Sequence, residues 1–237
     1  FLKSYSKNCL PNHNLVGLVS TEECLDCLSN KENISFLELS FRERRESLLF
    51  SLIKEKKPDF VLSIQYPWII SKEIIDFLEG NFLNLHNAKL PEYKGFNSIS
   101  HEILNQEKYH TSTLLKASFE IDTGIILREK SIEIYPNDTA YELWYRSINL
   151  SSELLIEYLA NIDSLKSFDL GNYTLKEIGN FYPKNSLEKL KLIPNNASID
   201  EIDRVSRSMW FPPKEPAFFK FKDRKIYVLP NKFKYKI

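Results

Sequence analysis

The sequence predicts an α/β protein with an open, mostly parallel sheet, helices on both faces of that sheet, and a small C-terminal region ending in a β-hairpin. Over the first two thirds of the chain, short continuously apolar runs alternate with amphipathic stretches, which is typical of buried parallel strands joined by helices. Beyond that, the chain is richer in turns and proline, and two strand-like runs close it. We therefore divide the chain into a main domain, residues 1–170, and a C-terminal region, residues 171–237.

The first predicted elements follow one another in strand–helix alternation. Between residues 41 and 57, apolar side chains recur at helical spacing, and Pro58 ends that helix. A second helix, 71–78, begins after the N-cap residue Ser71, and Gly80 follows its end. The predicted strands of this part are the apolar runs 14–19, 34–39, 60–64 and 82–86. This order is that of a Rossmann-like sheet.

The later elements follow a different rhythm. Residues 111–119 and 125–134 are strand-like runs separated by a turn that contains Asp122 and Gly124. One apolar face runs along a long predicted helix, 139–160. The closing hairpin is predicted from residues 217–221 and 224–229.

Composition narrows the classes of function. The 237 residues carry 32 Lys and Arg against 32 Asp and Glu, and this balance argues against a protein that mainly binds nucleic acid or anionic membrane. No apolar run approaches membrane-spanning length and no secretory leader precedes the chain, so we expect a cytoplasmic protein. The chain begins with Phe rather than Met, which is consistent with an incomplete N-terminus.

Cysteine and glycine usage excludes two further kinds of site. The three cysteines form an odd set that suits a reducing compartment. Cys24 and Cys27 lack the further ligands of a structural zinc site, so no metal is expected there. Their acidic neighbours would raise the thiol pKa, which disfavours redox chemistry. None of the six glycines falls in a phosphate-loop pattern, which leaves a dinucleotide site unsupported.

Three polar residues form the candidate catalytic set. Asn84 and His86 are two apart on a predicted strand, so their side chains share a face, and they lie at the carboxyl end where open α/β sheets bind ligands. Asp122 lies on the turn between two later strands. An amide, an imidazole and a carboxylate in one cleft suit acyl transfer. The alternative is that Asn84 and His86 only anchor a loop and that Asp122 is an ordinary turn residue.

These residues carry a resemblance to a family. Asn84-x-His86, Leu90-Pro91-x-Tyr93-x-Gly95 and Asp122-x-Gly124, in this order, resemble the formyltransferases that use N10-formyltetrahydrofolate. The family's usual first motif is Asn-x-His-Pro-Ser, and this chain has Asn87-Ala88 at the last two positions. The resemblance covers roughly residues 14–165 and identifies residues 1–170 as the catalytic domain.

The resemblance implies roles for individual residues. Asn84 would hydrogen-bond the formyl oxygen, His86 would stabilise the oxyanion, and Asp122 would hold His86 and relay a proton from the attacking amine. No metal is needed. The remaining implied contacts are with the folate co-substrate, through Trp68, Ile69, Ile70, Ala117, Ile121 and Asp122, and with the acceptor, through Tyr93, Lys94, Gly95 and Asn97.

The acceptor is the finer question. The tail resembles those of enzymes that formylate nucleoside-diphosphate amino sugars, which implies a dTDP- or UDP-linked 4-amino-4,6-dideoxyhexose destined for bacterial surface polysaccharide. The 67 residues after 170 are too few for the barrel of a methionyl-tRNA enzyme, although basic residues crowd the final hairpin. A relative that hydrolyses or only binds formyltetrahydrofolate is the other alternative. Aromatic residues in the tail, among them Phe219 and Phe221, indicate packing or a homodimer interface.

Overall fold

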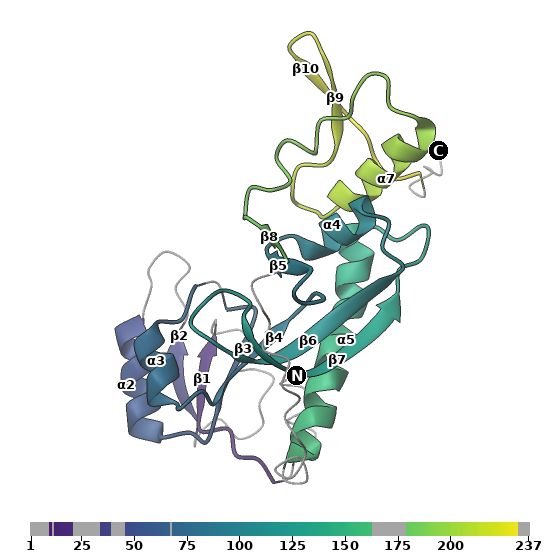
Figure 1. The fold of residues 1–237 in the computed structure, drawn as a ribbon. Coiled ribbons are helices and arrows are strands. Elements are labelled where there is room, and N and C mark those ends of the chain that lie inside the picture. Colours follow the sequence, from purple (N-terminus) through teal and green to yellow (C-terminus); the bar gives the residue numbers. More distant parts are fainter. Residues whose placement is uncertain are drawn as a thin grey trace. The chain divides into compact units, whose positions relative to one another are not determined.

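The computed structural model describes residues 10, 12–20, 34–38, 46–66, 68–162 and 179–231 (Figure 1). These residues form two compact units. The first contains the described residues up to His86 together with Leu114–Arg128 and 152–162; the second contains Asn87–Thr113, Glu129–Ser151 and 179–231. The boundary predicted at residue 170, like Cys24 and Cys27, lies outside the described residues. The division at that point stays a prediction.

The first unit begins with two short parallel strands and two helices. Strands β1 (Gly17–Ser20) and β2 (Ser35–Glu38) pair in parallel, with Gly17 opposite Ser35. Helices α2 (Glu46–Lys56) and α3 (Lys72–Phe77) bury one face each. Their apolar residues form a cluster with the start of the fourth strand: Leu49, Ile53, Ile74, Ile75, Leu78 and Phe82.

The main sheet has four strands in the order β3–β4–β6–β7. Strands β3 (Val61–Ile64) and β4 (Phe82–His86) are parallel, with Val61 opposite Phe82. Contacts from Thr111 to Ser131 and from Thr113 to Glu129 run in opposite directions along the two strands, so β6 (Tyr109–Ala117) and β7 (Gly124–Glu133) are antiparallel. The sheet therefore ends in a pair joined by one tight turn.

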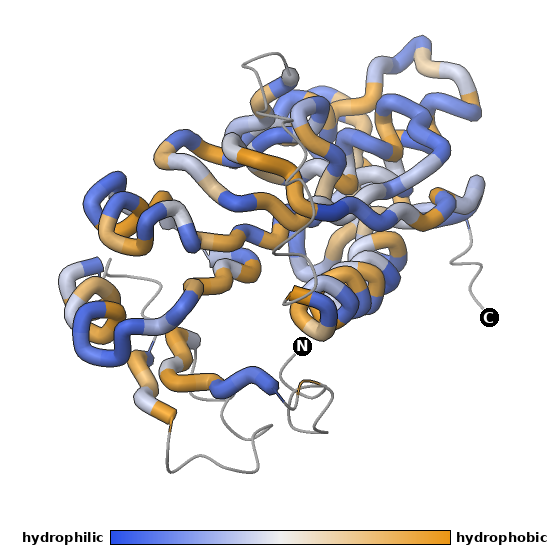
Figure 2. Tube along the Cα trace, turned by 60° about the horizontal axis from the view of Figure 1, so that its bottom comes forward, coloured by the Kyte–Doolittle hydropathy of each residue, from blue (hydrophilic) through white to orange (hydrophobic). Residues whose placement is uncertain are grey.

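Helix α5 (Ala140–Ala160) supplies much of the core of the first unit. Its buried residues Leu154, Leu155, Tyr158 and Leu159 pack against Leu83, Leu85, Leu114 and Leu127 of the sheet strands. Figure 2 shows apolar and hydrophilic positions alternating around the turns of this helix, as expected when one face is buried. Among the described helices, none is long and apolar enough to cross a membrane.

The second unit holds the short elements that follow the main strands. Strand β5 (Tyr93–Gly95) pairs in parallel with β8 (Asn180–Tyr182), and β9 (Phe218–Phe221) pairs in antiparallel fashion with β10 (Arg224–Tyr227). Helix α4 (Ser98–Leu104) and helix α7 (Ile199–Met209) complete the unit. Its larger apolar cluster joins Val205 and Met209 of α7 to Ile193 and Ala217, with Leu104 packed against it.

The observed architecture confirms the predicted fold class. The α/β organisation, the mostly parallel sheet and the closing hairpin are all present. The strand 82–86 and the helix that begins near 139 were placed within a residue. The sequence-based prediction missed the β5–β8 pair and the helices α4 and α7.

Candidate active site

Strand β4 presents Asn84 and His86 to one side of the sheet. Phe82, Leu83 and Leu85 are buried, whereas Asn84 and His86 are only partly buried. The two polar side chains therefore lie on the same face at the carboxyl end of the strand, as their spacing predicts. Within the described residues, the Asn84 side chain makes no hydrogen bond to another group. Its carboxamide is thus not committed to holding the fold.

The turn between β6 and β7 sets the position of Asp122. The Ser118 amide donates to the Thr123 carbonyl at 2.9 Å, and the Thr123 hydroxyl donates to the Glu120 carbonyl at 2.9 Å. Asp122 adopts a left-handed conformation with a φ of 50°, which Asp and Asn tolerate better than most residues. Gly124, at a φ of 135°, is required, because a Cβ there would lie 2.0 Å from the Lys116 carbonyl oxygen.

The strand end and the turn bring His86 and Asp122 together. His86 Nδ1 lies 3.3 Å from Asp122 Oδ1, and the two side chains are 11% and 10% exposed. The predicted proximity of this pair is confirmed. A carboxylate at Nδ1 fixes the orientation of the ring and leaves Nε2 to face a reacting group. The catalytic roles of Asn84, His86 and Asp122 remain predictions.

The residues expected to meet the folate divide into packed and exposed ones. Ile70 and Ala117 pack against the cluster formed by α2 and α3, and Trp68 contacts Tyr66 edge to face with ring centroids 5.5 Å apart. Ile69 and Ile121 are 55% and 36% exposed. Exposed apolar side chains of this kind suit a flat heteroaromatic ring. The exposed apolar residues fit a folate ring, and their contact with a folate stays a prediction.

The residues expected to bind the acceptor lie in the second unit, and several have contacts there. The Tyr93 hydroxyl donates to Glu107 Oε1 at 2.8 Å, and burial raises the pKa of this phenol. Lys94 is buried, and Asn97 Nδ2 donates to the Lys184 carbonyl at 3.1 Å. Gly95 is needed because a Cβ there would lie 2.4 Å from the Tyr182 carbonyl oxygen. Their expected role in acceptor binding stays a prediction.

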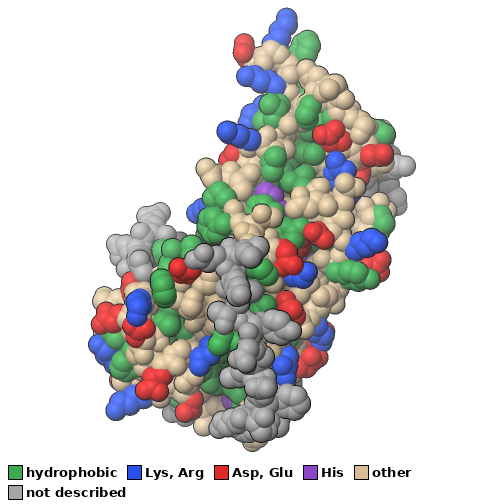
Figure 3. Space-filling model, viewed as in Figure 1, with side chains coloured by type: hydrophobic (Ala, Val, Ile, Leu, Met, Phe, Trp, Pro, Cys, Tyr) green, Lys and Arg blue, Asp and Glu red, His purple; other side chains and the backbone are tan. Residues whose placement is uncertain are grey.

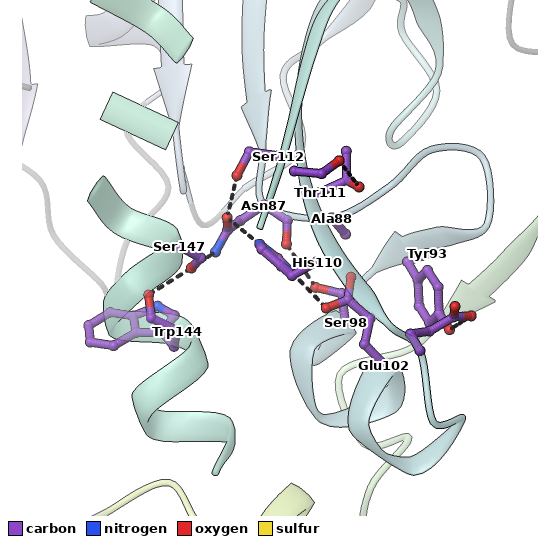
Figure 4. A network of polar contacts seen from close by, with 12 residues as sticks. Asn87, Ala88, Tyr93, Ser98, Glu102, His110, Thr111, Ser112, Trp144 and Ser147 are labelled. Atoms are coloured by element: carbon purple, nitrogen blue, oxygen red, sulfur yellow. Dashed lines mark hydrogen bonds and ion pairs between the residues drawn. The ribbon is translucent and has the colours of Figure 1, made fainter. Parts of the chain in front are cut away.

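A buried polar network that the sequence did not predict surrounds Asn87 (Figure 4). It joins this residue to His110, Ser112, Ser147 and Ser151, all within the second unit. Spacing along the chain could not reveal it, because its members are 23 to 64 residues away from Asn87. The departure from the family's Pro at this position is the one signal that pointed here. Among the described residues, no group of three or more metal-ligating side chains gathers anywhere.

The fold and the site define a class of protein. Residues 20–159, more than half of the chain, match the model of the formyl transferase family. The chain belongs to this family, and the predicted family is confirmed.

Among its relatives, the chain is 32% identical over 174 residues to the GDP-perosamine N-formyltransferase of Brucella melitensis, a match to 73% of this chain and 65% of the relative. It is 29% identical over 198 residues to the methionyl-tRNA formyltransferase of Clostridium tetani, a match to 83% of this chain and 62% of that protein. The chain thus spans less than two thirds of the length of these relatives.

A solved structure shares the fold over most of the chain. It is the N-formyltransferase of Helicobacter canadensis in complex with folinic acid and dTDP-3-aminofucose. The two share 18% sequence identity with a TM-score of 0.65, and the match covers 90% of this chain and 86% of the other.

Proposed function

We propose that this protein transfers a formyl group from N10-formyltetrahydrofolate to the amine of a nucleoside-diphosphate amino sugar. The sugar is of the 4-amino-4,6-dideoxyhexose type, carried on dTDP or UDP, and the reaction takes place in the cytoplasm during assembly of a bacterial surface polysaccharide. The observation that carries the proposal is the His86–Asp122 pair, 3.3 Å apart, at the end of β4 in a chain of the formyl transferase family.

The residues divide the chemistry as follows. The Asn84 carboxamide and His86 Nε2 both donate to the formyl oxygen, where negative charge develops as the amine attacks. A ring that donates from both nitrogens is cationic, and the Asp122 carboxylate at Nδ1 stabilises it. Asp122 also accepts the proton that the attacking nitrogen loses. One carbon–nitrogen bond forms and the formyl carbon–N10 bond breaks, and the proton that Asp122 accepted passes to N10, so that neutral tetrahydrofolate leaves.

Apolar residues of two segments would hold the folate. Ile69 and Ile121 present exposed apolar surface, and Trp68, Ile70 and Ala117 are partly buried. Binding supplies the activated one-carbon unit, and these side chains would exclude water from it. The folinic acid in the Helicobacter enzyme supports a folate as the donor.

Two considerations favour an amino-sugar nucleotide as the acceptor. The Brucella relative acts on GDP-perosamine and the Helicobacter enzyme binds dTDP-3-aminofucose. The chain also has equal numbers of acidic and basic residues, whereas an enzyme that grips tRNA gains affinity with each phosphate that it neutralises. Methionyl-tRNA remains the second candidate because of the Clostridium relative.

The closing hairpin supports a homodimer. Phe221, Ile226 and Tyr227 are exposed on β9 and β10, and Figure 3 shows hydrophobic side chains among basic ones over the hairpin. Burying such side chains against a second copy would remove apolar surface from water. Sedimentation should give a dimer for the wild type and a monomer for Ile226→Lys. The matched control Ile199→Lys, which changes another exposed isoleucine, should stay dimeric. A monomeric wild type contradicts this part of the proposal.

A side-by-side transfer assay tests the acceptor. Radiolabelled formyltetrahydrofolate is incubated with the protein and one of three acceptors: a dTDP-linked 4-amino-4,6-dideoxyglucose, its UDP counterpart, or initiator methionyl-tRNA. We expect label on an amino-sugar nucleotide and none on tRNA. Label on tRNA alone would establish the second candidate. Labelled formate without transfer to any acceptor would instead identify a hydrolase.

A further inference from the structure

Asn87 follows His86 directly in the chain, and its partly buried side chain is the centre of a network whose other members are buried. Its Nδ2 donates to Ser147 Oγ at 2.6 Å. Its Oδ1 lies 3.1 Å from His110 Nε2 and 3.0 Å from Ser112 Oγ. Figure 4 shows these groups converging on Asn87 from α5 and from the strand that carries His110. Both ends of the carboxamide are therefore held.

The hydrogen-bond partners fix the orientation of the carboxamide. The Ser147 hydroxyl donates its single proton to the Trp144 carbonyl at 2.7 Å, so toward Asn87 it can only accept. The group facing Ser147 must then be the amide nitrogen, and the amide oxygen must face His110. Because this oxygen is an acceptor only, His110 Nε2 must carry a proton. A flipped carboxamide would break both contacts.

The far side of His110 is anchored as well. Its Nδ1 lies 2.7 Å from Glu102 Oε2, and the two side chains are 0% and 1% exposed. Either the ring donates to the carboxylate or a protonated Glu102 donates to the ring, and in both cases one proton joins them. The ring is thereby bound at both nitrogens. Asn87 Oδ1 rests on a group that cannot rotate without losing a buried hydrogen bond.

The backbone beyond His86 is held too. The Ser98 hydroxyl donates to the Asn87 carbonyl at 3.2 Å, and the Thr113 hydroxyl donates to the Ala88 carbonyl at 2.8 Å. Two consecutive peptide carbonyls are therefore fixed by side chains. This position holds Pro in the usual family motif, and Pro restricts its own φ by its ring. Here the same stretch of backbone is restrained by hydrogen bonds.

Resting on the proposed function, we propose that Asn87 is a positioning residue for His86. The network lies within the second unit and acts on His86 through the peptide bond between residues 86 and 87. It restrains the peptide bond that follows His86, and so limits the backbone conformations of His86 and the orientations open to its imidazole. Asn87 itself touches neither substrate. The network would serve as this chain's substitute for the family's proline.

The test compares Asn87→Ala with Ser147→Ala and a control, Ser208→Ala. Ser208 is buried in α7 and donates to the Val205 carbonyl at 2.9 Å, so the control also loses a buried hydroxyl but lies outside the network. Two experiments are made: steady-state kinetics give the kcat and KM of formyl transfer, and NMR gives the imidazole signals of the four histidines, assigned by substitution.

We expect Asn87→Ala to lower kcat by about 10- to 100-fold with the KM for folate within about twofold, as misplacement of a reacting group does. The His86 signals should split or broaden. Ser147→Ala should show the same changes, smaller, and Ser208→Ala none. A folded Asn87→Ala protein with wild-type kcat and a single sharp His86 signal overturns the proposal. If Asn87→Ala does not fold, Ser147→Ala decides in the same way. If the wild type transfers formyl to no acceptor, the proposed function fails while the NMR comparison still decides the role of Asn87.

Discussion

Replacing Asp122 by Asn removes one charge from the candidate site and leaves its geometry. Asn has nearly the same size as Asp and also tolerates the left-handed conformation that residue 122 adopts, with its φ of 50°. The turn should therefore survive, because the hydrogen bonds that Ser118 and Thr123 donate within it are unchanged. The substitution isolates the chemical role of the carboxylate from its structural one.

The size of the effect follows from the contact between the two side chains. Asp122 Oδ1 lies 3.3 Å from His86 Nδ1, and both side chains are nearly buried, so water screens their interaction poorly. The variant loses the group that stabilises a cationic His86 and the acceptor for the amine proton. A positioned proton acceptor contributes about 10²- to 10⁴-fold, which corresponds to about 2.7–5.4 kcal/mol of transition-state stabilisation. We expect kcat to fall by that factor.

The assay is steady-state formyl transfer to the amino-sugar nucleotide, followed by chromatography of the formylated product. Folate affinity, measured by fluorescence titration, should change by no more than a few-fold, because the apolar residues around Trp68 and Ile121 are intact. Asp76→Asn is the matched control: it removes an exposed carboxylate whose partner is Lys72, 2.5 Å away. An Asp122→Asn protein that binds folate and turns over at the wild-type rate would show that this carboxylate has only a structural role in the turn.

Three further outcomes follow from packing and burial. Gly124→Ala should lower the free energy of unfolding in urea by about 2–3 kcal/mol, because φ is 135° and the new Cβ would meet the Lys116 carbonyl; an unchanged midpoint contradicts this. Burial lowers the pKa of His101 to about 4, below the unfolded value of 6.5. The free energy of unfolding should therefore be unaffected by this group above pH 6.5 and should decline as the pH falls toward 4. Urea midpoints should show this decline, and His101→Gln should reduce it. Leu155→Ala, at a fully buried position, should cost about 2–5 kcal/mol by the same measurement, and a smaller loss would indicate that the core refills the cavity.

The sequence predicted the elements whose signal is local. The strand at 82–86 and the helix from 140 have continuous or periodic apolar patterns that depend on nothing distant. The β5–β8 pair was missed because each partner has three residues and more than 80 residues separate them, so no pattern accumulates. Helix α7 could have been found: Ser198 accepts from the Glu201 amide, and Ser-x-x-Glu is a recognisable start signal.

The candidate site shows the same division. Two-residue spacing on a strand placed Asn84 and His86 on one face, and the motif placed Asp122 beside His86. The polar partners of Asn87 could not be predicted, since a carboxamide reveals nothing about its hydrogen bonds until the chain is folded. The same holds for Tyr93, whose hydroxyl contacts Glu107 and Asn105 rather than a position that its motif identifies.

The chain passes several times from one compact unit to the other. The positions of these crossings determine which segments can be exchanged between related proteins. Within the described residues they fall at the end of β4 and within β6, β7 and α5, and the remaining one, between Leu175 and Lys176, lies outside the described residues. A gene fragment that encodes either unit alone would carry half of two strands and half of a helix. Each half would lack the continuation that completes its hydrogen-bond ladder. Exchange of parts between family members should therefore succeed through the turns, such as the one that holds Asp122, and fail where a border of the units cuts β6, β7 or α5.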